Sequence, residues 1–166
     1  ADLGFKIVDP DALSEEVFYL TGRLPNILQL FGIKLADGAM KAGRDFIAPE
    51  HLEALKDDFI IAQFFIKTLT ELDDPQTRLV GMLLVKDGRR DFTVAAVQEV
   101  ARRGGVELDS RRANDICTDL LVNNVLVWNH GSYSIANGGL IFYAQKKEFF
   151  GSALEEARAA LTGVHA

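Results

Sequence analysis

The sequence has few of the residues that build disulfides and metal sites. It contains one cysteine and three histidines among 166 residues. Cys117 excludes an internal disulfide and a Cys-x-x-Cys metal site, and its place in an apolar helical pattern predicts a small buried residue. His51, His130 and His165 have no spacing typical of metal ligands, so we expect no metal site.

Phosphate-binding and membrane-spanning motifs are also absent from the sequence. No segment matches the phosphate loop GxxxxGK(S/T), and Gly22, Gly32 and Gly38 do not form a GxGxxG motif after a strand. No apolar run approaches the ~20 residues that span a bilayer, and no secretory leader is evident. We therefore expect a cytoplasmic chain that does not bind membranes and that, lacking a self-contained active site, is not an enzyme by itself.

Positive charge is scarce, and it is unevenly distributed. The formal net charge is -6, which argues against a general nucleic-acid binder because phosphate neutralisation supplies most non-specific affinity. Residues 1–72 carry 7 basic and 12 acidic residues, a balance of -5, whereas residues 73–166 carry 11 and 12, a balance of -1. With the turn signal Leu72-Asp73-Asp74-Pro75, this shift predicts two domains, 1–72 and 73–166.

Helix start and stop signals occupy the first of these domains. Asp9 and Pro10 predict the start of a helix that Gly22 ends, and Pro25 opens a second helix that runs to about Ala42. A third start lies at Pro49. The run that follows it, 59–69, is apolar on nearly every side, so we expect it to be wedged between two layers.

The second domain shows further helices and then a hairpin. Three helices are expected from their caps and apolar periods: 75–86, 93–104 and 109–123. Aromatic and β-branched runs at 125–128 and 132–135 flank a short Asn129-His130-Gly131 loop, which indicates two antiparallel strands. A last helix is expected over 140–161, divided or bent at Gly151. Three helices followed by a hairpin is the order of a winged helix domain in a mainly α protein.

The third of these helices would read DNA if the chain were a transcription factor. The candidate contacts are the polar residues at its start: Ser110, Arg111, Arg112 and Asn114. Asp109, Asp115 and Asp119 share the helix and would repel a phosphate backbone, and the hairpin tip has no Arg or Lys. DNA binding is therefore the disfavoured alternative.

Three stretches of the first domain resemble the helical lid that follows the nucleotide-binding core in signal-transduction ATPases, the AAA-related P-loop proteins of the STAND class. These stretches are Asp9-Pro10-Asp11-Ala12, Thr21-Gly22-Arg23-Leu24-Pro25-Asn26-Ile27-Leu28-Gln29 and Ile47-Ala48-Pro49-Glu50-His51-Leu52. In that family a Thr-Gly-Gly-x-Pro or Gly-x-Pro segment opens a lid helix, its proline packs against bound nucleotide, and a winged helix domain commonly follows. The resemblance implies a helical lid bundle followed by a winged helix.

The resemblance also implies a function and a set of site residues. Pro25 would pack against the nucleotide, Gly22 would fix the turn, and Arg23 would replace the usual glycine and add a phosphate-facing cation. ATP or ADP with magnesium would be held by a missing ATPase core of the same polypeptide, and the fragment would hold no cofactor itself. The start at Ala1 rather than Met agrees with a fragment of a longer chain. Many members sense the diphosphate with a histidine after the wing, but 135–138 has none, so that sensor is not expected.

Three alternatives remain open on the sequence. The junction around Gly22 and Pro25 could be a plain helical corner, since such punctuation is common between helices. The chain could be a stand-alone winged helix regulator of transcription, with an N-terminal effector or dimerisation domain. It could also be a protein-interaction module, with Trp128 and Tyr133 as its central contacts if both are exposed.

Overall fold

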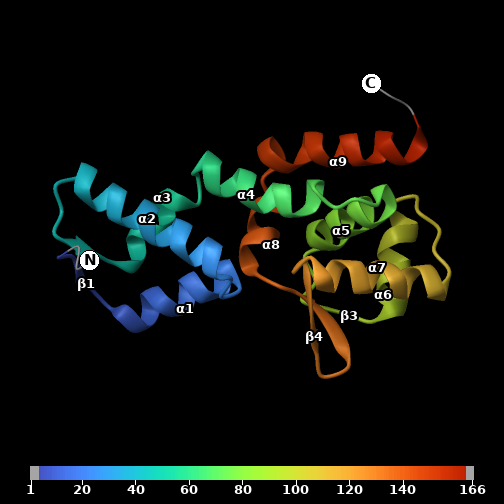
Figure 1. Cartoon of the computed structure of the whole chain (residues 1–166), viewed down its shortest axis with the longest axis horizontal. Helices are drawn as coiled ribbons and strands as arrows, with labels where there is room; N and C mark the ends of the chain where they lie inside the picture. The colour runs from blue at the N-terminus through green and yellow to red at the C-terminus, as the bar shows by residue number, and fades with distance from the viewer. Residues whose placement is uncertain (1–3, 164–166) are drawn as a thin grey trace. The chain divides into compact units, whose positions relative to one another are not determined.

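The computed structural model describes residues 4–163, without the side chains of 147–149, and the protein is mainly helical. His165 lies outside the described residues. The chain divides into two compact units, residues 1–62 and 63–166 (Figure 1). The division falls inside one helix, before the boundary at 72/73 expected from charge and turn signals, and that domain boundary stays a prediction.

The first unit is built from helices that begin and end where the sequence indicates. Its elements are β1 (Lys6–Ile7), α1 (Pro10–Thr21), α2 (Pro25–Lys41), β2 (Phe46–Ile47), the 3-10 helix η1 (Pro49–His51), α3 (Leu52–Leu55) and the start of α4 (Phe59–Thr70). The Asp9 carboxylate accepts from the Ala12 N–H at the start of α1, and Gly22 ends that helix in the left-handed conformation. β1 pairs in parallel with β2, which joins the segment before α1 to the segment after α2.

The core of the first unit lies where α1, α2 and α3 meet. Leu20, Ile27, Phe31 and Leu52 are almost fully buried. Each such side chain contributes about 2 kcal/mol through removal of its apolar surface from water. The apolar stripes of the sequence therefore form this core.

The expectation that α4 is buried on nearly every side is wrong for its first turn. Phe59 is 61% exposed and Ile60 57% exposed, while Ile61, Phe65 and Leu69 are buried. Asp58 caps the helix by accepting from the N–H groups of Ile60 and Ile61. The cap places the first turn at the surface, and one face of the helix supplies the core contacts.

The second unit is organised around α5 (Pro75–Asp87), which packs against each of the helices that follow it. Those elements are β3 (Asp91–Phe92), α6 (Val94–Arg103), α7 (Ser110–Val122), β4 (Leu126–Asn129), β5 (Ser132–Ile135), α8 (Gly138–Gln145) and α9 (Lys147–Thr162). The three strands form an antiparallel sheet in the order β3-β5-β4. α5 is buried on almost all sides, from Thr77 to Val85, which is what a central helix requires.

Three details of the second unit differ from the expectations. The strand β3 was not expected; it has two residues, and its pairing of Phe92 with Tyr133 depends on a segment far along the chain. The last helix divides at Lys146, where the backbone turns extended, whereas Gly151 lies inside α9. The hairpin turn is shorter than expected, because Asn129 pairs with Ser132 across His130 and Gly131.

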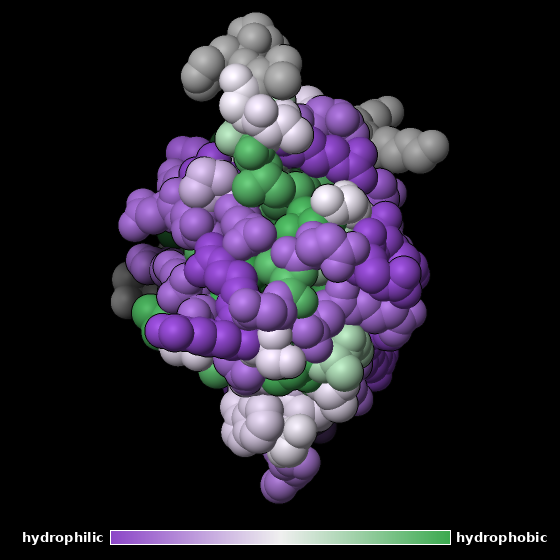
Figure 2. All heavy atoms as spheres, turned by 90° about the vertical axis from the view of Figure 1, so that its right-hand side faces the viewer, coloured by the Kyte–Doolittle hydropathy of each residue, from purple (hydrophilic) through white to green (hydrophobic). Residues whose placement is uncertain are grey.

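One face of the molecule, the right-hand side of Figure 1, is mostly hydrophilic. Figure 2 shows a face covered largely by hydrophilic residues, with a narrow band of hydrophobic residues between them. Among the described residues, no helix combines the length and apolar character needed to cross a membrane.

Candidate nucleotide-contacting corner

The corner between α1 and α2 is a tight backbone reversal. Gly22 and Arg23 both adopt left-handed conformations, with φ of 60° and 62°. The Gly22 N–H donates to the Phe18 carbonyl at 3.0 Å, and the Leu24 N–H donates to the Thr21 carbonyl at 3.2 Å. Two consecutive left-handed residues turn the chain so that α2 begins directly at Pro25.

A buried hydroxyl holds this corner. Thr21 has no exposed surface; its hydroxyl donates to the Val17 carbonyl at 2.7 Å and accepts from the Arg23 N–H at 3.3 Å. The second contact holds Arg23, the non-glycine residue of this corner that takes the left-handed conformation. Thr21 belongs to the stretch that resembles the lid motif, but no role was predicted for its side chain.

Arg23 lies against the aromatic surface of α1. Its guanidinium carbon stands 5.1 Å from the centroid of the Phe18 ring, within the range of a cation–π contact. The φ of 62° also gives a physical reason why glycine suits this position, because a Cβ is disfavoured there. The side chain is exposed, so a bound anion could reach its cation.

Pro25 is exposed at the first position of α2, and the helix start is open. Leu24 occupies the cap position and offers no side-chain hydrogen bond, while the Ile27 N–H is bonded locally by the Asn26 side chain at 3.0 Å. A proline has no N–H to satisfy at this position. The exposed ring of Pro25 lies at the surface of the corner, next to the positive end of the helix dipole.

An open hollow beside the corner carries charges of both signs. It has a volume of about 430 Å³ and is lined by Asp11, Ser14, Glu15, Phe18, Tyr19 and Arg23. The two carboxylates on α1 disfavour a phosphate in this hollow, whereas Phe18 and Tyr19 offer aromatic surface. A nucleotide at the corner would therefore place a base, rather than its phosphates, on the α1 side.

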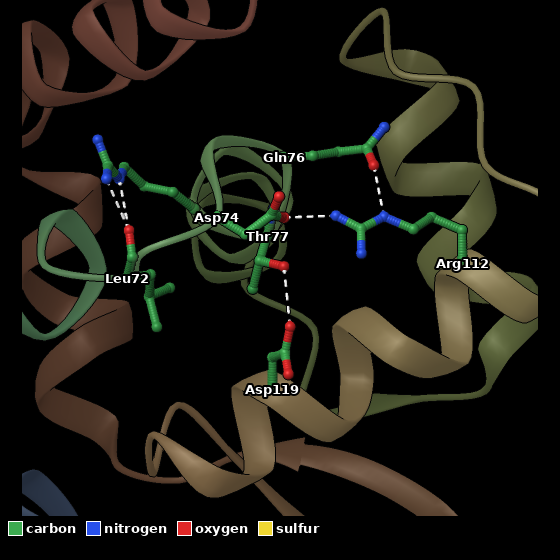
Figure 3. Close-up of polar contacts among 7 residues, drawn as sticks. Leu72, Asp74, Gln76, Thr77, Arg112 and Asp119 are labelled. Carbon is green, nitrogen blue, oxygen red and sulfur yellow. Dashed lines mark hydrogen bonds and ion pairs between the residues drawn. The ribbon is translucent and has the colours of Figure 1, made fainter.

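The second set of candidate residues lies at the start of α7, and Arg112 is engaged there by α5. Figure 3 shows its guanidinium bonded to the carboxylate of Asp74 and, at 2.6 Å, to the side-chain oxygen of Gln76. The same Asp74 carboxylate caps α5 by accepting from the Thr77 N–H at 2.6 Å. Arg112 therefore ties the start of α7 to the start of α5.

The electrostatics of this junction favour an ionised Asp74. Partial burial alone would raise the pKa of its carboxyl, but hydrogen bonds from Thr77 and the positive charge of Arg112 outweigh burial and lower the pKa below its ordinary value. Thr77 is itself buried, and its hydroxyl lies 3.4 Å from the Asp119 carboxylate. The network joins α5 and α7 at two points.

The other candidates for DNA contact differ in whether their side chains are exposed or already hydrogen-bonded within α7. The Asn114 side chain donates to the Ser110 carbonyl at 2.7 Å, so it is used within α7. Arg111 and Ser110 are exposed. Asp109 caps the helix by accepting from the Arg112 N–H at 2.7 Å, which places its carboxylate beside them.

The two hairpin aromatics have different environments. Trp128 is 58% exposed, whereas Tyr133 is 9% exposed and packs edge-on against Trp128 at 4.8 Å between ring centroids. Tyr133 is thus part of the core, and Trp128 alone presents an aromatic surface to a partner.

The described residues were compared with the pattern of a metal site, and the sequence and fold were compared with known proteins. No group of three or more His, Cys, Asp or Glu side chains in the described part of the chain has the arrangement of a metal site. Comparison with protein-family models, with curated proteins and with solved structures found no match.

Proposed function

We propose that this chain is a non-catalytic regulatory segment of a signal-transduction ATPase of the STAND class, in which the α1–α2 corner contacts a nucleotide held by a core elsewhere on the polypeptide. The observation that carries the proposal is the corner itself. Two left-handed residues, Gly22 and Arg23, place an exposed Pro25 at the open start of α2. This is the conformation that a Gly-x-Pro lid motif would need to present its proline to a ligand.

The topology of the second unit supports the winged helix part of the proposal. The order α5, β3, α6, α7 and then the β4–β5 hairpin agrees with three helices followed by a wing. The strand β3 gives the hairpin a third partner, so the wing is anchored to the segment between the first two helices. A wing anchored in this way can move with the helices as one body, which a relay of nucleotide state requires.

Within this proposal the chain supplies contacts and the parent core supplies chemistry. ATP or ADP with magnesium would bind to the core, in the cytoplasm, and any hydrolysis would take place there. Pro25 and Arg23 would bias the closed position of the lid only if their contacts differ between the two nucleotide states. The protein partner that reads the change would dock on the second unit.

Substitution of Pro25 tests the proposal in the intact parent protein. Pro25→Ala should weaken nucleotide binding by about tenfold, equivalent to about 1.4 kcal/mol, measured by calorimetric titration with ADP and with an ATP analogue. Pro75→Ala is the matched control, because Pro75 is also an exposed proline at the first position of a helix. Equal affinities for the Pro25 variant and the unaltered protein would refute the proposal.

A stand-alone DNA-binding regulator is the second candidate, favoured by the exposed Arg111 at the start of α7. On this account Arg111→Ala would weaken binding to duplex DNA and reduce its salt dependence. Arg112 is a poor probe because its loss would disturb the junction with α5. Absence of salt-sensitive binding to a mixed-sequence duplex would eliminate this candidate.

A further inference from the structure

The first unit contains a second hollow, distinct from the corner, with a volume of about 580 Å³. It lies between α2, the segment around β2, and α3, and its floor includes Leu35, Ala39 and Leu55, all nearly buried. This volume and an apolar floor with a few polar side chains are typical of sites for small molecules. Neither the resemblance nor the proposed function makes use of it.

A glycine keeps one wall of this hollow open. Gly38 lies in the interior of α2, where glycine is the least favourable residue apart from proline. A Cβ built on it would meet no atom within 4 Å, so packing within the described part of the chain gives no reason for a glycine there. Its effect is to expose the helix backbone to whatever occupies the hollow.

The charged side chains around the hollow sort into paired and unpaired groups. Lys34 is held by Asp58 at 2.7 Å, and Glu53 is held by Lys56 at 2.6 Å. Arg44 and Glu50 also line the hollow, and they form no ion pair with each other or with another described residue. Among the described residues that line the hollow, Arg44 and Glu50 are thus exposed charged side chains without an ion-pair partner, and they lie beside an apolar floor.

The aromatic wall completes the site. Phe46 and His51 lie side by side at 5.5 Å between ring centroids, and both line the hollow. The His51 Nδ1 accepts from the Ala48 N–H at 3.1 Å, which fixes the ring and leaves its Nε2 as the other polar atom. This wall offers a planar surface against which an apolar or aromatic group can stack.

We propose that this hollow binds an apolar α-amino acid. The Arg44 guanidinium would hold the carboxylate, the Glu50 carboxylate would hold the ammonium group, and the side chain would lie on the floor against Phe46, with Gly38 leaving room for it. Because Arg44 and Glu50 are both exposed, a ligand with one charge would lose one of the two ion pairs without any burial penalty on the other side chain. This proposal does not depend on nucleotide contact at the corner, so each of the two proposals can fail without affecting the other.

L-Phenylalanine titrated into the whole 166-residue chain tests the proposal. We expect saturable shifts of the backbone amide resonances of Gly38, Arg44 and His51 at millimolar ligand or below. 3-Phenylpropionate lacks the ammonium group and phenethylamine lacks the carboxylate, so each should bind at least tenfold more weakly. No shifts at these residues, or equal binding of either one-charge analogue, would overturn the proposal.

Variants of the two α2 glycines show whether the shifts arise in this hollow. Gly38→Leu should fill it and abolish binding, while the longer side chain favours the helix and preserves the fold. Gly32→Leu is the matched control, since Gly32 is also an exposed interior glycine of α2 with no atom within 4 Å of an added Cβ, and it does not line the hollow. Binding that survives Gly38→Leu would contradict the assignment. Arg44→Gln should weaken binding at least tenfold, and Lys41→Gln, outside the hollow, should leave it unchanged.

Discussion

At the scale of single residues, Arg23 shows how a backbone conformation can conflict with a side chain. Its φ is 62°, and the Thr21 hydroxyl and the Phe18 ring stabilise the residue in this conformation. The left-handed region costs a residue with a Cβ about 1 kcal/mol relative to glycine. The contacts with Thr21 and Phe18 therefore offset the strain of the left-handed conformation at Arg23. In the sequence this strain corresponds to an arginine, and not a second glycine, directly after Gly22.

This conflict predicts an inverted order of stability for two variants. Arg23→Gly and Arg23→Ala both lose the contact with Phe18, but the glycine variant should be more stable by about 1 kcal/mol because it takes the left-handed conformation without strain. At Lys67, an exposed position inside α4, the alanine variant should be the more stable by about 1 kcal/mol. Urea unfolding of the four variants measures both differences. The same order at both positions would contradict the left-handed assignment.

Cys117 gives a second prediction at this scale. The thiol is fully buried, and burial raises the pKa of Cys117 to about 11. Because the thiolate is the reactive form, a disulfide reagent at pH 8 should leave the folded chain unmodified and should react once denaturant is added. Rapid labelling of the folded protein would show that α7 opens on the time scale of the reaction.

At the scale of elements, the junction between α5 and α7 depends on Arg112. Arg112→Ala removes its bonds to Asp74 and Gln76 and should lower the free energy of unfolding by about 1 kcal/mol, since both partners are partly exposed. Arg111→Ala, one position earlier and exposed, should change it by less than about 0.5 kcal/mol. Thermal or urea unfolding compares the two. If both substitutions lowered the free energy of unfolding equally, the bonds of Arg112 to Asp74 and Gln76 would add no stability beyond that of an exposed arginine.

The same junction predicts a pH dependence. The folded pKa of Asp74 is lowered, and so is that of Asp58, where hydrogen bonds from Lys34 and from the backbone outweigh burial. A lowered carboxyl pKa stabilises the fold above the ordinary value of about 4, and this contribution is lost as the pH falls through the folded pKa. The free energy of unfolding should therefore decrease below about pH 4, and Asp74→Asn plus Asp58→Asn should flatten that decrease. A double variant with the full acid dependence would exclude these two carboxyls as its cause.

Local signals account for the elements that the sequence predicts correctly. Asp9, Pro25, Pro75, Thr93 and Asp109 each start a helix, or sit at its cap, where the pattern indicates. The features that were missed depend on distant partners. β3 exists because Phe92 pairs with Tyr133, and Arg112 is engaged because folding brings Asp74 and Gln76 next to it. No pattern within a short window contains that information.

In the candidate site, too, local sequence signals were predicted correctly and the side-chain contacts were not. The sequence placed a glycine turn and an N-terminal proline at the corner, and the structure has both. It gave no sign that the Thr21 hydroxyl bridges Val17 and Arg23, or that the Arg23 guanidinium lies over Phe18. These contacts depend on how the end of α1 turns, and that geometry is not encoded in residue type alone.

At the scale of the whole molecule, we propose that this chain belongs to a longer polypeptide with a phosphate loop. The most direct measurement is the intact mass of the native polypeptide in its source cells, with its sequence read by tandem mass spectrometry. The account predicts a mass well above the 18.3 kDa of this chain and a GxxxxGK(S/T) segment on the N-terminal side of Ala1. A native mass of 18.3 kDa would remove the ATPase core and contradict the account.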